Sequence, residues 1–164
     1  RLSPVFTTNR MVSDYANKFY IPANERWNIM VKDDFAGARN LNSWKHKVRQ
    51  SWHDVKILNA HFSGAGEEIK VGDHVDVGLE LHLGALNPDD VKVQVLYGKV
   101  SPEEELINPL ISTLDMNESM NDGKWTYKGK ITCNESGQHG FSVRVLPFNS
   151  ALSDGHETGL IRWG

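Results

Sequence analysis

The strongest constraint on the fold of this chain is an alternation of apolar and polar residues that runs from about residue 55 to the C-terminus. In residues 75–83, valine or leucine occupies every odd-numbered position, and polar residues or glycine occupy the even-numbered ones. A side-chain period of two places the apolar residues on one face of a β-strand. The pattern therefore predicts strands that bury one face in a shared core.

The same alternation recurs in further runs, which are separated by turn signals such as Asn87-Pro88 and Asn121-Asp122-Gly123. Short strands with no helical pattern between them favour a mainly β fold, namely an immunoglobulin-like antiparallel β-sandwich. A partly open barrel is the alternative. We predict seven strands, near residues 54–62, 74–83, 91–98, 106–116, 124–133, 139–147 and 159–163.

The N-terminal third of the chain follows the helical period instead. Within residues 7–21, Val12, Tyr15 and Phe19 recur at the spacing of one helical face. Pro22 follows, and proline offers no backbone N–H to a helix and restricts the residue before it. The pattern therefore predicts a first helix that ends just before Pro22.

A second helical pattern spans residues 33–51, after a link in residues 23–32 that we expect to be a short helical turn or irregular. Asp33 and Asp34 in the first turn suit the helix dipole. Gly37 costs about 1 kcal/mol relative to alanine inside a helix, which favours a helix held by packing. The sandwich is thus expected to follow two α-helices, the second with an apolar stripe of Phe35, Ala38, Leu41, Trp44 and Val48.

Charge divides the chain at the same place as the hydrophobic period. Residues 1–53 carry a net charge of +5 and residues 54–164 a net charge of −8, which together give the formal value of −3. A shift in composition that coincides with a change of period indicates a boundary between structural units. We predict a helical segment over residues 1–52 and a β-sandwich domain over residues 53–164.

Composition excludes several classes of protein. The sequence pI of about 6.2 gives no basic surface for nucleic acid, and no apolar run approaches the roughly 18 residues of a membrane span. Because Cys133 is the single cysteine, it cannot form an internal disulfide. We therefore expect a reducing, cytoplasmic location and no nucleic-acid or membrane partner.

No pattern of chemistry-bearing residues predicts a catalytic, cofactor-binding or metal site. The seven histidines lack the paired spacings of zinc ligands, and Ser136 lacks the strand-turn-helix elbow of a hydrolase nucleophile. The Gly64-Ala65-Gly66 run lacks the third glycine of a dinucleotide loop and is interpreted as a turn. Asp89 and Asp90 are interpreted as solvated charge, and Cys133 as a buried, inert thiol.

Aromatic residues on the strands suggest one binding hypothesis. Trp125 and Tyr127 occupy the same face of a predicted strand, and sandwiches that bind sugars stack them on exposed aromatic rings. Such a face is more often part of the core. Trp125 and Tyr127 are nevertheless the candidates for sugar stacking.

Two stretches carry a resemblance to a known family. Residues 6–23, FTTNRMVSDYANKFYIPA, resemble the run that ends the catalytic region of bacterial-type α-glucan (glycogen or maltodextrin) phosphorylases. Residues 86–98, 136–147 and 159–164 resemble the extra C-terminal domain carried by one branch of those enzymes. The resemblance covers nearly the whole chain, and the start at Arg1 suggests a piece excised from a longer protein.

The resemblance implies a pyridoxal-phosphate enzyme that releases glucose 1-phosphate from α-1,4-glucan. The Ser-Gly-Met-Lys-like motif that holds the family's cofactor does not occur in these residues. No catalytic residue is therefore carried over, and the cofactor is expected in the parent enzyme rather than in this segment. Phosphorolysis by this chain alone is not expected.

The sequence thus predicts a non-catalytic C-terminal domain with a structural, interdomain role. Its expected partners are the catalytic domains of the same polypeptide, with self-association of the apolar helical faces as a further option. One alternative is a carbohydrate-binding module that tethers the enzyme to glycogen or maltodextrin. Another is a free-standing adaptor with no enzyme parent.

Overall fold

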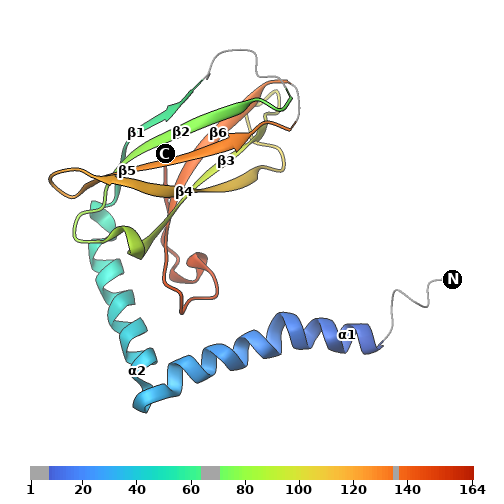
Figure 1. Ribbon diagram of the computed structural model, residues 1–164, viewed down its shortest axis with the longest axis vertical. Helices are drawn as coiled ribbons and strands as arrows, with labels where there is room; N and C mark the ends of the chain where they lie inside the picture. The colour runs from blue at the N-terminus through green and yellow to red at the C-terminus, as the bar shows by residue number, and fades with distance from the viewer. Residues whose placement is uncertain (1–7, 64–70, 135–136) are drawn as a thin grey trace. The chain divides into compact units, whose positions relative to one another are not determined.

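The computed structural model describes residues 8–63, 71–134 and 137–164 (Figure 1). It divides into two compact units, Arg1–Trp44 and Lys45–Gly164. The division falls after Trp44, within a helix. It therefore precedes the predicted boundary after residue 52, which is based on the change from helical to strand periodicity in the sequence.

The first unit is helical, but its first helix does not end before Pro22 as predicted. Helix α1 (Thr8–Tyr15) continues through a π-helical turn, η1 (Ala16–Tyr20), into helix α2 (Ile21–Ser51). In the π turn the Ile21 N–H bonds to the Ala16 carbonyl, five residues back. This wider turn relieves the clash that a proline ring makes with the carbonyl four residues before it, so the helix passes Pro22.

The helical path breaks farther along, where the sequence predicted a helix start. Lys32 has an extended backbone, and Asp33, Asp34 and Phe35 have φ angles of 51°, 52° and 63°. Aspartate adopts this left-handed region more readily than most residues. A Cβ on Gly37 would collide with the carbonyl oxygen of Ile29. The close approach after the break therefore requires glycine at a position where helix propensity alone disfavours it.

The second unit is a β domain, and the predicted mainly β fold is confirmed. Short 3₁₀ turns, η2 (Trp52–Asp54), η3 (Pro88–Asp90) and η4 (Gly155–Thr158), join or flank the strands. All seven predicted strands are present: β1 (Lys56–Phe62), β2 (His74–His82), β3 (Val91–Lys99), β4 (Leu110–Ser119), β5 (Lys124–Thr132), β6 (His139–Pro147) and β7 (Arg162–Trp163).

The strands form an antiparallel sheet of order β1-β2-β5-β4-β3-β6-β7, which folds into two layers (Figure 1). Strand β4 belongs to both layers, because it pairs with β5 on one side and with β3 on the other. Strand β1, at one edge, meets β6, next to the other edge, where the Phe62 and Phe141 rings stack with centroids 5.0 Å apart. The predicted antiparallel sandwich is thus confirmed, in a form that is nearly closed like a barrel.

The core lies between the two layers and is built from the alternating apolar positions. On β2 and β3 the valines and leucines that the alternation assigned to one face are buried, and Leu81 and Val95 are fully so. The C-terminal end of α2 joins this core through Val48. Its neighbour Lys47 places Nζ 2.7 Å from Asp90 Oδ2, which also accepts the Asn87 N–H at 2.9 Å.

This ion pair corrects the interpretation of Asp89 and Asp90 as solvated charge. Asp89 is exposed, but Asp90 is buried and paired with Lys47. The backbone N–H of Phe148 also donates to the Asp90 carbonyl, at 2.8 Å. Asp90 therefore holds together the end of α2, the turn before β3 and the segment after β6.

Candidate ligand-binding pocket

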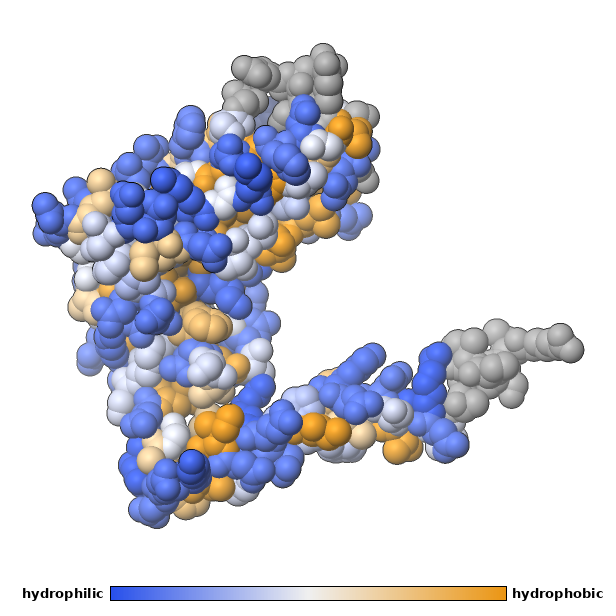
Figure 2. Space-filling model, in the orientation of Figure 1, coloured by the Kyte–Doolittle hydropathy of each residue, from blue (hydrophilic) through white to orange (hydrophobic). Residues whose placement is uncertain are grey.

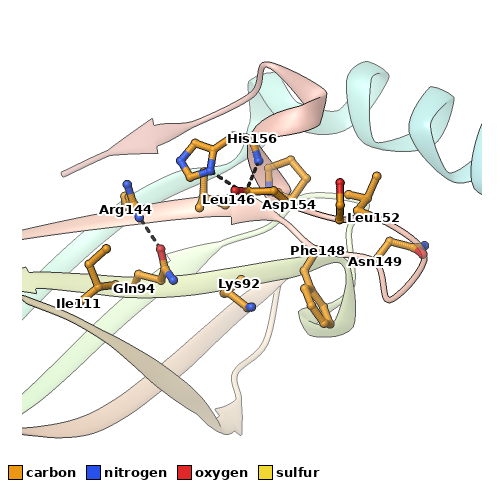
Figure 3. Close-up of a pocket in the computed structure, with 13 residues that line it drawn as sticks. Lys92, Gln94, Ile111, Arg144, Leu146, Phe148, Asn149, Leu152, Asp154 and His156 are labelled. Atoms are coloured by element: carbon orange, nitrogen blue, oxygen red, sulfur yellow. Dashed lines mark hydrogen bonds and ion pairs between the residues drawn. The ribbon is translucent and has the colours of Figure 1, made fainter. Parts of the chain in front are cut away.

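A pocket of about 430 Å³ lies on the outer face of strands β3 and β6, beside the segment that follows β6 (Figure 3). Cavities of this size hold small organic ligands. Its polar lining comes from three separate stretches of chain, with Lys92 and Gln94 on β3, Arg144 on β6, and Asp154 and His156 at the turn η4.

Strand alternation explains why these cationic side chains face outward. On β3, Lys92 and Gln94 alternate with Val91, Val93 and Val95, which are buried in the core. Gln94 is directly opposite Arg144 in the β3–β6 pairing, and Lys92 is opposite Leu146. Lys92 and Arg144 are therefore diagonal neighbours on the same face of the sheet.

Neutral partners position both cations. Arg144 Nε donates to Gln94 Oε1 at 2.9 Å, as the dashed line in Figure 3 marks. The Arg144 guanidinium lies 5.7 Å from the centroid of the Trp163 ring, and Lys92 Nζ lies 4.8 Å from that of Phe148. Within the described residues, neither cation lies within ion-pair distance of a carboxylate.

The acidic residue of the lining, Asp154, is occupied by its neighbour. Asp154 Oδ1 accepts the backbone N–H of His156 at 2.9 Å and lies 2.6 Å from His156 Nδ1. The backbone hydrogen bond is the largest cause that lowers the pKa of Asp154, followed by the side-chain bond and by the charges of His156 and Arg144. The carboxylate is thus ionised at neutral pH, and the backbone and ring of His156 occupy its Oδ1.

The candidate sugar-stacking residues lie elsewhere, on β5. Trp125 is half-buried, whereas Tyr127 is only 3% exposed, so the ring face of Tyr127 is not open to solvent. The Tyr127 hydroxyl is buried without a hydrogen-bond partner in the described part of the chain. Burial, followed by the charge of Asp89, raises its pKa to about 12. Sugar stacking at Trp125 and Tyr127 stays a prediction.

Cys133 and the candidate metal ligands can be compared with the sequence predictions, whereas two short motifs cannot. Cys133 is buried as predicted, and burial, followed by the charge of Asp73, raises its pKa. Among the residues that the structure describes, no group of three or more histidine, cysteine, aspartate or glutamate residues is placed to hold a metal ion. Ser136 and the Gly64-Ala65-Gly66 turn lie outside the described residues.

Sequence reasoning did not find the pocket, because its lining residues form no local motif. Gln94 and Arg144 are 50 positions apart and meet only through the β3–β6 pairing. The available signal was a cation at a polar position of each of two strands. That signal becomes specific only when the pairing of the strands is known.

Comparison with known proteins assigns the family. A family model described as the glycogen phosphorylase C-terminal domain matches residues 52–164. The maltodextrin phosphorylase of Thermococcus litoralis is 30% identical over 99% of this chain and 19% of its own length. A glycogen phosphorylase of Mycobacterium tuberculosis is 26% identical over 98% of this chain and 18% of its own length. This chain, which spans about a fifth of such relatives, belongs to the family of glycogen phosphorylase C-terminal domains.

Proposed function

We propose that this chain acts as a non-catalytic domain of an α-glucan phosphorylase and that its role is structural, through packing on the rest of that enzyme. The enzyme would release glucose 1-phosphate from α-1,4-glucan. Two facts support the proposal: the relatives are about five times longer than the matched segment, and the described part of the helical unit exposes large apolar side chains.

The apolar surface of the helical unit is the observation that carries the proposal. Figure 2 shows hydrophobic side chains on the outside of this segment. None of the described residues before Lys45 is buried. Large apolar side chains that are each at least half exposed there are Met11, Val12, Tyr15, Phe19, Tyr20, Ile21, Trp27, Ile29 and Phe35. A surface of this kind is typical of a protein–protein interface.

The residues present do not fit the cofactor of the parent family. Pyridoxal phosphate forms a Schiff base with a lysine that the protein desolvates. In the described ranges no lysine is buried, and Lys92, in the pocket, is half-buried with its ammonium over Phe148. We therefore propose that the remainder of the enzyme binds pyridoxal phosphate.

We also propose that the protein acts in the cytoplasm. The lone cysteine supports a reducing, cytoplasmic setting. No helix in the described residues is long and apolar enough to cross a membrane.

Grafting tests the structural role directly. This chain would replace the matched segment of the T. litoralis maltodextrin phosphorylase, and hydrogen exchange would be compared between the fusion and the isolated chain. We expect residues 8–35 to gain protection in the fusion, because their apolar side chains become buried. Unchanged exchange in an active fusion would contradict the proposal.

Two variants of the fusion supply the control. Trp27 is 63% exposed in the isolated chain and Asn28 is its exposed polar neighbour. Trp27→Glu should destabilise the fusion by at least about 2 kcal/mol, since it places a charge in a buried interface, whereas Asn28→Glu should have little effect. Equal melting temperatures for both variants would locate the interface elsewhere.

The alternative function, a carbohydrate-binding module, is supported by the partial exposure of Trp125. The burial of Tyr127 favours the structural role, because a buried ring offers no stacking face. Affinity electrophoresis in glycogen distinguishes the two functions, with Trp27→Ala as a control that removes a tryptophan outside the sheet. Retardation that Trp125→Ala abolishes and Trp27→Ala preserves would establish the module.

A further inference from the structure

The pocket beside η4 combines two cations with an apolar wall. The proposed structural role explains neither the charge nor the shape of this pocket. Lys92 and Arg144 are diagonal neighbours across the β3–β6 pair, which corresponds to a separation of about 7–8 Å between their backbones. Two long side chains at this spacing can close on a single anion.

The charge of the lining favours an anion over a neutral ligand. Arg144 is held by the neutral oxygen of Gln94, so the rest of its guanidinium fork remains to donate. Asp154 opposes an anion, but its Oδ1 is engaged by the backbone N–H and the ring Nδ1 of His156, at 2.9 and 2.6 Å, and the cations Lys92 and Arg144 outnumber this carboxylate in the lining. With Nδ1 of His156 turned to Asp154, Nε2 is the ring nitrogen that can meet a ligand.

The size and the apolar part of the lining favour an organic anion over a free inorganic one. The volume of about 430 Å³ is much larger than a lone phosphate requires. Phe148, which is 41% exposed, and Leu152 line the same pocket as the cations. Amide and hydroxyl groups of Asn149 and Ser153 add partners for ligand hydroxyls.

We propose that this pocket binds a small phosphate ester of a sugar, with the phosphate on Lys92 and Arg144 and the sugar against Phe148. Guanidinium and ammonium groups are the side chains that bind phosphate most strongly. The proposal goes beyond the structural role and does not depend on it.

Isothermal titration calorimetry on the full chain tests the site with three probes: glucose 1-phosphate, inorganic phosphate and glucose. We expect glucose 1-phosphate to bind with a dissociation constant below about 1 mM, inorganic phosphate to bind at least about tenfold more weakly, and glucose to give no signal. Equal binding of the ester and inorganic phosphate would overturn the proposal, as would binding of glucose as tight as that of the ester.

Charge-removing variants locate the binding. Lys92→Gln and Arg144→Gln should each weaken binding of the ester by at least about tenfold, because each removes a charge-assisted contact. Lys128→Gln removes the same charge from an exposed position on β5 and should leave binding unchanged. Circular dichroism confirms that each variant is folded. Equal losses of affinity in all three variants, or no loss in any, would overturn the assignment. The absence of wild-type binding at about 10 mM ester, tenfold above the expected dissociation constant, would overturn it as well.

Discussion

The helical unit and the sheet unit of this chain differ in how far their apolar side chains are buried. In the described part of the helical unit, large apolar residues such as Phe19 and Trp27 are more than half exposed, and none is buried. In the sheet unit, residues such as Leu81 and Val95 are fully buried. The sheet therefore supplies its own core, whereas the described helical residues before Lys45 form none.

The difference explains why one unit is expected to be stable alone and the other is not. Isolated helices are marginal in water, because most helical stability in proteins comes from packing an apolar face. Antiparallel strands that enclose a core bury that face within the same unit. We therefore expect the helical unit to need a partner surface, which the proposed enzyme would provide.

Limited proteolysis gives the largest expected contrast. Trypsin should cut the isolated chain after Arg10, Lys18 or Arg26 at least about a hundredfold faster than within the sheet, because opening the uncovered helices costs little free energy. Mass spectrometry of the early fragments measures both rates. Digestion in urea, which unfolds both units, should remove the contrast. Comparable rates for a monomeric chain in buffer would mean that the helical unit is as stable as the sheet unit, contrary to this prediction.

Paired core and surface substitutions measure the same difference between the units as a free energy of unfolding. Leu81→Ala should lower the free energy of unfolding by about 2–5 kcal/mol, because Leu81 is fully buried in the sheet unit. Phe19→Ala, at a position that is 59% exposed, should change it by less than about 0.5 kcal/mol. Urea denaturation followed by circular dichroism measures both. A cost at Phe19 that matched the one at Leu81 would mean that the isolated chain already covers the helix.

Alkaline titration probes the sheet unit through Tyr127, whose pKa is raised to about 12 from 10.0. Below pH 10 the phenol is neutral in both states, and the full stability is present. Above pH 10 the unfolded chain ionises first, so stability falls until about pH 12, by about 3 kcal/mol for two pKa units. Tyr127→Phe should remove this part of the pH dependence. A wild-type profile that ran parallel to that of the variant would place the hydroxyl in contact with solvent.

The smallest expected effect is the change in the free energy of unfolding that Tyr127→Phe causes at neutral pH. The Tyr127 hydroxyl has no hydrogen-bond partner among the described residues, so Tyr127→Phe should keep or raise the free energy of unfolding, by up to about 1 kcal/mol. Urea denaturation at pH 7 measures the change. A loss of more than 1 kcal/mol would reveal a partner, such as a bound water.

Local pattern predicted the strands well and the helical path poorly. The alternation in residues 75–83 identifies β2 because both faces of a strand are recorded in neighbouring positions. Pro22 misled the prediction of the first helix, because a π turn accommodates it. The actual break at Asp33 and Asp34 depends on three successive left-handed residues, which acidic residues at a helix start do not indicate.

The strand segments, their buried faces and the family resemblance could all be predicted from the residues alone, because each of these is carried by short-range spacing or by local motifs. The folded arrangement was needed to show that Asp90 is buried against Lys47, that Tyr127 is enclosed, and that Lys92 and Arg144 share one pocket. These outcomes depend on which strands pair and in which register. A side-chain period defines a face but not its neighbour, so residues far apart in the chain meet only when the sheet is assembled.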